Sequence, residues 1–134
     1  MANEMRKFRH QIVLDVSDFL CTHEEITKII GVEPDYARNR GDKRTETATF
    51  QRSSWALYSD AQEYGSDFEE HVSNFLALMD GKDEAIRKLQ LVAKVEMTII
   101  CIYDGVSKPS VHFDLPFLDF LNRNRIPVDI DLFV

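Results

Sequence analysis

The sequence predicts an α+β fold: a single-domain two-layer sandwich over residues 1–134, with helices packed on one face of a mainly antiparallel sheet. Segments with apolar residues at every second position alternate along the chain with segments that follow helical spacing. The 134 residues, 44% of them hydrophobic, suit one globular core. No Gly/Ser-rich or Pro-rich linker divides the chain, so we expect one domain.

The first half begins with a strand and a short helix. Apolar residues alternate from Phe8 to Val16, which predicts a strand with one buried face. Residues 22–25 form a capping-box pattern, and Gly31 suits the left-handed end of the helix that follows. Residues 36–44 lack apolar periodicity and are predicted to form a loop. Residues 45–59 look extended, as either one bent strand or two paired strands.

The second half contains the strongest periodic segments. A second capping box at residues 66–69 precedes a helix whose apolar face runs from Phe68 to Met79. Residues 92–103 predict a strand whose C-terminal half is apolar on both faces. The remaining predicted elements are a helix over residues 83–91, a turn at Asp104-Gly105, a short strand at Val111 and Phe113, a helix over residues 115–124 and a last strand over residues 128–133.

An ordered set of short segments resembles a known bacterial family. The set comprises Glu25-Ile26-Thr27, Ile30-Gly31, Pro34, Gly41-Asp42, Ser54-Trp55-Ala56-Leu57, Phe68-Glu69-Glu70-His71-Val72, Leu76 and Val128-Asp129-Ile130-Asp131-Leu132. In this order the segments resemble domain of unknown function 4279, over nearly the whole chain. The resemblance implies a small bacterial α+β protein and supplies no catalytic residue.

The sequence shows no sign of export or of membrane insertion. No apolar stretch follows the charged N-terminal residues, and no window approaches about 18 consecutive apolar residues. Cys21 and Cys101 form no CxxC pattern, and we expect two reduced thiols rather than a disulfide. We therefore expect a cytoplasmic protein that does not associate with membranes.

Most familiar chemistries lack their required residues. No glycine-rich phosphate loop is present, and the four histidines are scattered. Asp67 and His71 share a helix face but have no third metal ligand nearby in the sequence, and Cys21 has no nucleophile signature around it. We therefore expect no cofactor and no metal, and we assign no catalytic residue.

The acidic residues of the last strand have two interpretations. Asp129 and Asp131 share one strand face, and Asp15 would join them if the strands are neighbours. Such carboxylates can perform acid/base chemistry, but alternating acids also protect a strand edge against aggregation. We favour the protective role, which burial of the acids would reverse.

Charge is distributed unevenly along the chain. The formal net charge of −7 divides into +3 for residues 36–52 and −10 for the remainder. The arginines of this basic segment match the geometry of carboxylate or phosphate groups, and Trp55 and Tyr58 could supply a stacking wall nearby. The candidate ligand-binding residues are Arg38, Arg40, Arg44 and Trp55. The alternative is a solvated loop whose basic groups pair with the acidic body.

These observations favour a non-catalytic protein-binding module, similar in kind to inhibitor or immunity proteins, whose acidic body engages a basic partner. The alternative function is a small anionic ligand-binding or enzymatic site at the basic 38–52 loop. Nucleic acid is not expected as a partner because the chain is acidic. The sequence leaves the oligomeric state open.

Overall fold

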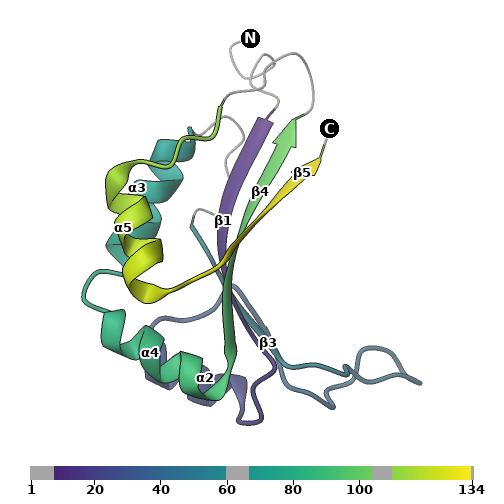
Figure 1. The fold of residues 1–134 in the computed structure, drawn as a ribbon. Helices are drawn as coiled ribbons and strands as arrows, with labels where there is room; N and C mark the ends of the chain where they lie inside the picture. Colours follow the sequence, from purple (N-terminus) through teal and green to yellow (C-terminus); the bar gives the residue numbers. More distant parts are fainter. Residues whose placement is uncertain (1–7, 60–66, 104–109, 134) are drawn as a thin grey trace.

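The computed structural model describes residues 8–59, 67–103 and 110–133, which form one sheet and one layer of helices (Figure 1). The elements in chain order are β1 (Phe8–Ser17), α2 (His23–Ile30), β2 (Tyr36–Arg38), β3 (Ser54–Tyr58), α3 (Phe68–Leu78), α4 (Asp83–Val92), β4 (Lys94–Tyr103), α5 (Leu115–Asn124) and β5 (Val128–Phe133). This architecture confirms the predicted α+β class.

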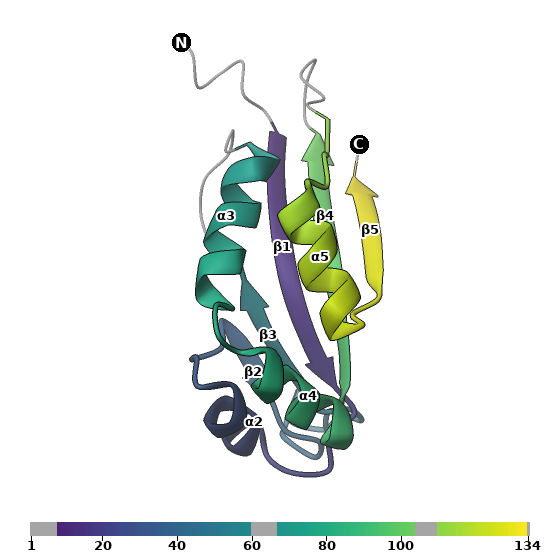
Figure 2. The same cartoon turned by 60° about the vertical axis from the view of Figure 1, so that its left-hand side comes forward.

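The five strands lie in the order β2-β3-β1-β4-β5. The first three neighbouring pairs are antiparallel, whereas β5 runs parallel to β4 and is reached through α5. All four helices cover the same face of the sheet (Figure 2). The opposite face carries no helix within the described residues, and we call it the open face.

Strand pleating sends alternate residues of β1 to opposite faces. Ile12, Leu14 and Val16 point into the helix layer and are completely buried. They join a core of large aromatic and aliphatic side chains from the helices, in which the rings of Phe75 and Phe120 meet edge to face, 5.7 Å apart. This packing holds α3 and α5 against the centre of the sheet.

Several predicted elements are confirmed with their boundaries. β1, α4, α5 and β5 match their predicted segments within one residue. Both sides of the capping box at Thr22 and Glu25 are present, and Gly31 ends α2 in a left-handed conformation with φ of 77°. The predicted cap residue Ser66 lies outside the described residues, and Asp67 is at the N-cap position of α3 without a capping hydrogen bond. The turn predicted at Asp104-Gly105 also lies outside them.

Three predictions about strands are wrong. Residues 36–38 form the short strand β2, although they lack apolar periodicity, because pairing with β3 determines their conformation. Residues 45–52 form no strand; they belong to an exposed loop closed by a single bridge between Lys43 and Thr49. Figure 1 shows this loop projecting on the side away from the helices. Val111 and Phe113 precede α5 without pairing, and both pack against the core instead.

A buried histidine lies near the beginning of β1. His10 is completely buried on β1, its ring lies edge-on to Phe68 at 5.8 Å, and its Nε2 atom is 3.4 Å from the Tyr103 hydroxyl. Burial lowers the pKa of His10, and the charge of His71 lowers it further, against the opposing effect of Glu69 and Asp67. The folded protein therefore favours neutral His10.

This environment predicts a loss of stability on acidification. Below the ordinary histidine pKa of 6.5, the unfolded chain binds a proton at His10 that the folded chain does not yet bind, so the free energy of unfolding falls. We expect His10→Phe to flatten this decline between about pH 7.5 and pH 5, measured by urea unfolding. The exposed His112 provides the control, since His112→Gln should retain the wild-type slope. An unchanged slope in His10→Phe would contradict the prediction.

Candidate functional site

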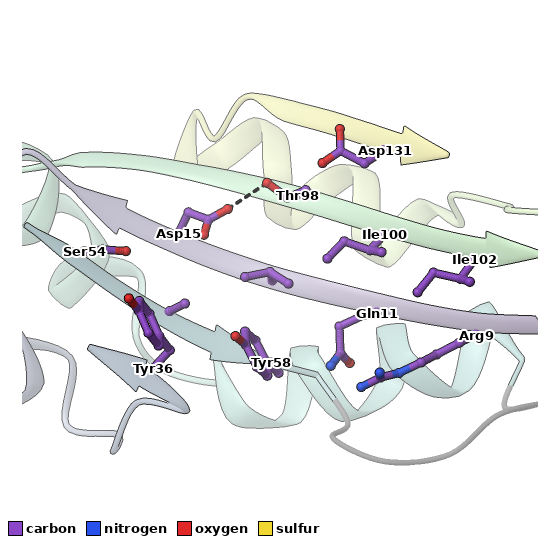
Figure 3. A pocket seen from close by; sticks show the side chains of 12 residues that line it. Arg9, Gln11, Asp15, Tyr36, Ser54, Tyr58, Thr98, Ile100, Ile102 and Asp131 are labelled. Carbon is purple, nitrogen blue, oxygen red and sulfur yellow. Dashed lines mark hydrogen bonds between the residues drawn. The ribbon is translucent and has the colours of Figure 1, made fainter. Parts of the chain in front are cut away.

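The open face of the sheet contains a trough with a volume of about 510 Å³ (Figure 3). Tyr36 and Tyr58 form one wall, and Ile100 and Ile102 of β4 form part of the other. The residues lining the trough are Arg9, Gln11, Val13, Asp15, Tyr36, Ser54, Ala56, Tyr58, Thr98, Ile100, Ile102 and Asp131. A cavity of this size falls within the range of small-molecule pockets, about 300–1,000 Å³.

The strand register explains why the sheet is hollow at this point. Ala56 lies between Tyr36 and Asp15 in one row across the sheet. In the next row, Val13 lies between Tyr58 and Thr98. Small side chains at the centre, with tall tyrosines on one side, leave unfilled space above the floor.

The floor is buried although no helix covers it. Gln11 is 4%, Val13 is 5% and Ala56 is 3% exposed. Their neighbours on the open face shield them, and the Gln11 carboxamide oxygen accepts a hydrogen bond from the Ser59 hydroxyl at 3.4 Å. The trough is therefore built on a fixed backbone and a packed floor rather than on loops.

Acidic side chains gather on the β1, β4 and β5 side of the trough. The register places Asp15 beside Glu96 and Asp129 beside Thr98. One row further along, Asp131 lies beside Ile100. We call Asp15, Glu96, Asp129 and Asp131 the acidic wall. The prediction that Asp129 and Asp131 share a strand face is confirmed, while Asp15 lies two strands away with β4 between.

Asp15 is the partly buried member of the acidic wall on the central strand. Partial burial raises the pKa of Asp15, and the charges of Glu96, Asp131 and Asp129 raise it further. A hydrogen bond donated by the Thr98 hydroxyl at 2.7 Å opposes this rise. Lys94 forms an ion pair with Glu96, with 3.3 Å between Nζ and Oε1. The folded protein therefore holds the Asp15 carboxylate at a cost in free energy at neutral pH.

The structure brings together only part of the set predicted at the basic loop. Arg38 and Arg44 line a second hollow of about 360 Å³ together with Phe50 and Arg52. The Arg38 guanidinium lies 4.2 Å from the centre of the Phe50 ring and donates a hydrogen bond to the Tyr36 hydroxyl at 2.6 Å. Arg40 is exposed and is not among the residues that line this hollow.

Trp55 does not line the loop, so its predicted role as a stacking wall is wrong. The pleat of β3 sends Trp55 to the helix face, where it is completely buried. Its indole Nε1–H donates a hydrogen bond to the Thr27 hydroxyl of α2 at 3.0 Å. Within the loop itself, the ring of Phe50 stacks with Arg38.

The other candidates from the sequence form no reactive group. Burial raises the pKa of the Cys21 thiol, which disfavours the thiolate, and Cys21 and Cys101 are both free. His71 is buried, with Nδ1 2.8 Å from the Ser59 hydroxyl oxygen, and that oxygen also accepts the Ile12 N–H at 2.9 Å. Across residues 8–59, 67–103 and 110–133, no group of three or more His, Cys, Asp or Glu side chains could hold a metal ion.

Sequence reasoning missed Tyr36, Ile100 and Ile102 as trough residues and assigned Tyr58 to a stacking wall beside the basic loop instead. The signal was present in β1, where Arg9, Gln11, Val13 and Asp15 occupy the alternate positions of the predicted strand. These residues were assigned to a solvated face. Identifying the trough also required the register with β3 and β4, which alternation within one strand does not contain.

The chain matches one family model. The match covers residues 7–134 and belongs to the model described as Domain of unknown function (DUF4279). No curated protein and no solved structure matches the chain. Within the described residues, no helix is long and apolar enough to cross a lipid bilayer. The family match spans nearly the whole sequence, and the chain therefore belongs to the DUF4279 family.

Proposed function

We propose that this protein is a non-catalytic binding module that engages a basic partner protein through the open face of its sheet. The observation that carries the proposal is the acidic wall beside the trough, on the face without a helix. Four carboxylates from three strands occupy neighbouring positions there. Lysine or arginine side chains of a partner would relieve their mutual repulsion.

Charge alone would give weak and unselective binding. An exposed ion pair contributes only about 0.2–1 kcal/mol, and salt screens it. The trough adds apolar area from Ile100 and Ile102 and two amphipathic rings from Tyr36 and Tyr58. Aromatic anchors in a shielded depression are typical of the residues that dominate binding energy in protein interfaces. We therefore expect a basic segment whose apolar side chain enters the trough.

The location and the class of protein are part of the same proposal. We infer a bacterial cytoplasmic protein, because the chain resembles a bacterial family and both of its cysteines are free thiols. A non-catalytic role is supported by the position of the acids on an open face and by the burial of the Ser59 and His71 side chains, which keeps this hydrogen-bonded pair away from a substrate. An inhibitor- or immunity-like role would use such a surface to cover a basic partner.

A charge-matched comparison of variants tests the proposed surface. We expect a decapeptide with four lysines and no acids to bind the wild-type protein at low ionic strength. Asp129→Asn/Asp131→Asn should weaken binding about tenfold, which corresponds to about 1.4 kcal/mol, measured by calorimetric titration. The control Glu46→Gln/Glu84→Gln removes the same charge at exposed positions outside the acidic wall and should leave affinity within about twofold.

Four outcomes would contradict the proposed function. The peptide could fail to bind, or both double variants could bind equally weakly, which would indicate an effect of net charge alone. Equal binding of the same peptide with glutamate in place of lysine would exclude a role for the acids. Turnover of a substrate that disappears in Asp15→Asn would contradict the non-catalytic part of the proposal.

A second candidate function is anion binding at the basic 38–52 loop. One observation favours it: Arg38, Arg44 and Arg52 line the same hollow around Phe50. Arg52 is partly neutralised, because its guanidinium donates two hydrogen bonds to Asp18, which also lower the pKa of that carboxyl. Arg38 and Arg44 would therefore carry most of the attraction for a phosphate or carboxylate group.

Inorganic phosphate is the probe for this second candidate. Saturable shifts of the loop amide signals in NMR titrations are expected, and Arg44→Gln should weaken phosphate binding by about tenfold. Arg40→Gln is the matched control, because this substitution removes the same charge from the same loop. Arg40 is not among the residues that line the hollow. Equal losses in the two variants, or shifts that do not saturate, would rule out a defined anion site.

A further inference from the structure

β5 is the last strand of the sheet and has a neighbour on only one side. It pairs with β4 from Val128 to Phe133, and no strand among the described residues lies beyond it. The unpaired side of an edge strand exposes backbone N–H and C=O groups that can pair with another chain. β2, at the other edge, has only three residues, so β5 offers the longer free edge.

The register identifies which backbone groups of β5 point outward. Met97 of β4 is the register partner of Val128, and the Met97 N–H donates a hydrogen bond to the carbonyl of Pro127 at 2.9 Å. In a parallel pair, alternate residues direct their backbone groups toward the neighbouring strand. Asp129 and Asp131 therefore face β4 with their backbone groups. The N–H and C=O groups of Val128, Ile130 and Leu132 point away from the sheet.

The side chains of this edge differ sharply between the two faces. On the helix side, Ile130 is 51% and Leu132 is 63% exposed. The partly exposed Leu118 of α5 lies on this side, where it lines a shallow hollow of about 460 Å³ with Val128. On the open face, Asp129 and Asp131 extend the acidic wall to the edge, and Phe133, which is 54% exposed, follows them at the end of the strand. Along Val128 to Leu132, an incoming strand would therefore meet apolar side chains on the helix side and carboxylates on the open face.

A second copy of the chain fits this edge poorly. If two β5 strands paired in antiparallel fashion with each face continuous, Asp129 and Asp131 would lie opposite acids of the other copy. Like charges directly opposite one another destabilise a strand pair. A strand in which basic residues alternate with apolar ones has the complementary pattern on both faces. Its basic side chains would reach the acidic wall while its apolar side chains cover Ile130 and Leu132.

We propose that the free edge of β5 binds an extended segment of a basic partner protein, with alternating basic and apolar residues, as a sixth strand of the sheet. This inference rests on the proposed function, because the segment belongs to the same partner that engages the open face. It adds the mode of recognition: backbone pairing supplies affinity, and the alternating side chains supply specificity.

Residue-resolved hydrogen exchange distinguishes this mode from binding in the trough alone. The probe is a decapeptide of alternating lysine and valine, added to ¹⁵N-labelled full-length protein. We expect exchange of the Ile130 and Leu132 amides to slow at least about tenfold in the complex, since these groups point outward. The amides of Asp129 and Asp131, which face β4, should change little. The same peptide with N-methyl groups on alternate residues should bind at least about tenfold more weakly.

A protein variant provides an independent check. Ile130→Lys places a charge at a position that is already half exposed and removes apolar area from the edge. With this variant, the lysine–valine peptide should no longer slow amide exchange at the edge. The decapeptide with four lysines used to test the proposed function should still bind to the acidic wall. Because N-methylation alters only the peptide, the test holds even if Ile130→Lys fails to fold.

The possible failures are separable. Binding of the lysine–valine peptide with unchanged exchange at Ile130 and Leu132 would overturn the edge inference and leave the proposed function standing. Absence of binding by any basic peptide would overturn both. Equal protection by a glutamate–valine peptide would remove the basic requirement. Concentration-dependent protection of these amides without peptide would show that a second copy occupies the edge.

Discussion

The central strand β1 is buried on both faces while helices cover only one of them, and the rest of the structure depends on how this is achieved. β1 pairs with β4 over ten residues and with β3 over five. On the helix face, α3 and α5 provide the cover. On the open face, Gln11 and Val13 are shielded by side chains of neighbouring strands. The trough exists because Val13 and Ala56 at its centre are smaller than the side chains that surround and shield them.

The same arrangement explains the electrostatic cost of the open face. A protein selected for stability alone would place apolar or neutral residues around a half-buried position on its central strand. Here burial raises the pKa of Asp15, and the charges of Glu96 beside it and of Asp129 and Asp131 two strands away raise it further. Unfavourable groups persist in folded proteins where function requires them. The proposed basic partner would account for this cost, for the adjacent trough and for the free β5 edge.

The sequence predicted the helices and long strands well because their signals are local. The capping box at Thr22 and the alternation in β1 and β5 required no knowledge of neighbouring strands. β2 could not be predicted, because three residues adopt strand geometry only by pairing with β3. Trp55 was misplaced because an uncertain strand boundary around residues 45–59 left the direction of its side chain undetermined. The trough depends on the alignment of five strands, which no single segment encodes.

The most direct test measures the free energy of unfolding of Asp15→Asn with and without a saturating lysine-rich peptide. Because the pKa of Asp15 is raised in the folded state, the charged carboxylate lowers the free energy of unfolding at pH values above 3.8, the ordinary pKa of aspartate. Asparagine removes this charge and can still accept the hydrogen bond from the Thr98 hydroxyl. We expect Asp15→Asn to be more stable than wild type at pH 7 without peptide, and to gain less stability from the peptide. A variant that is less stable alone and equally stabilised by the peptide would contradict the account.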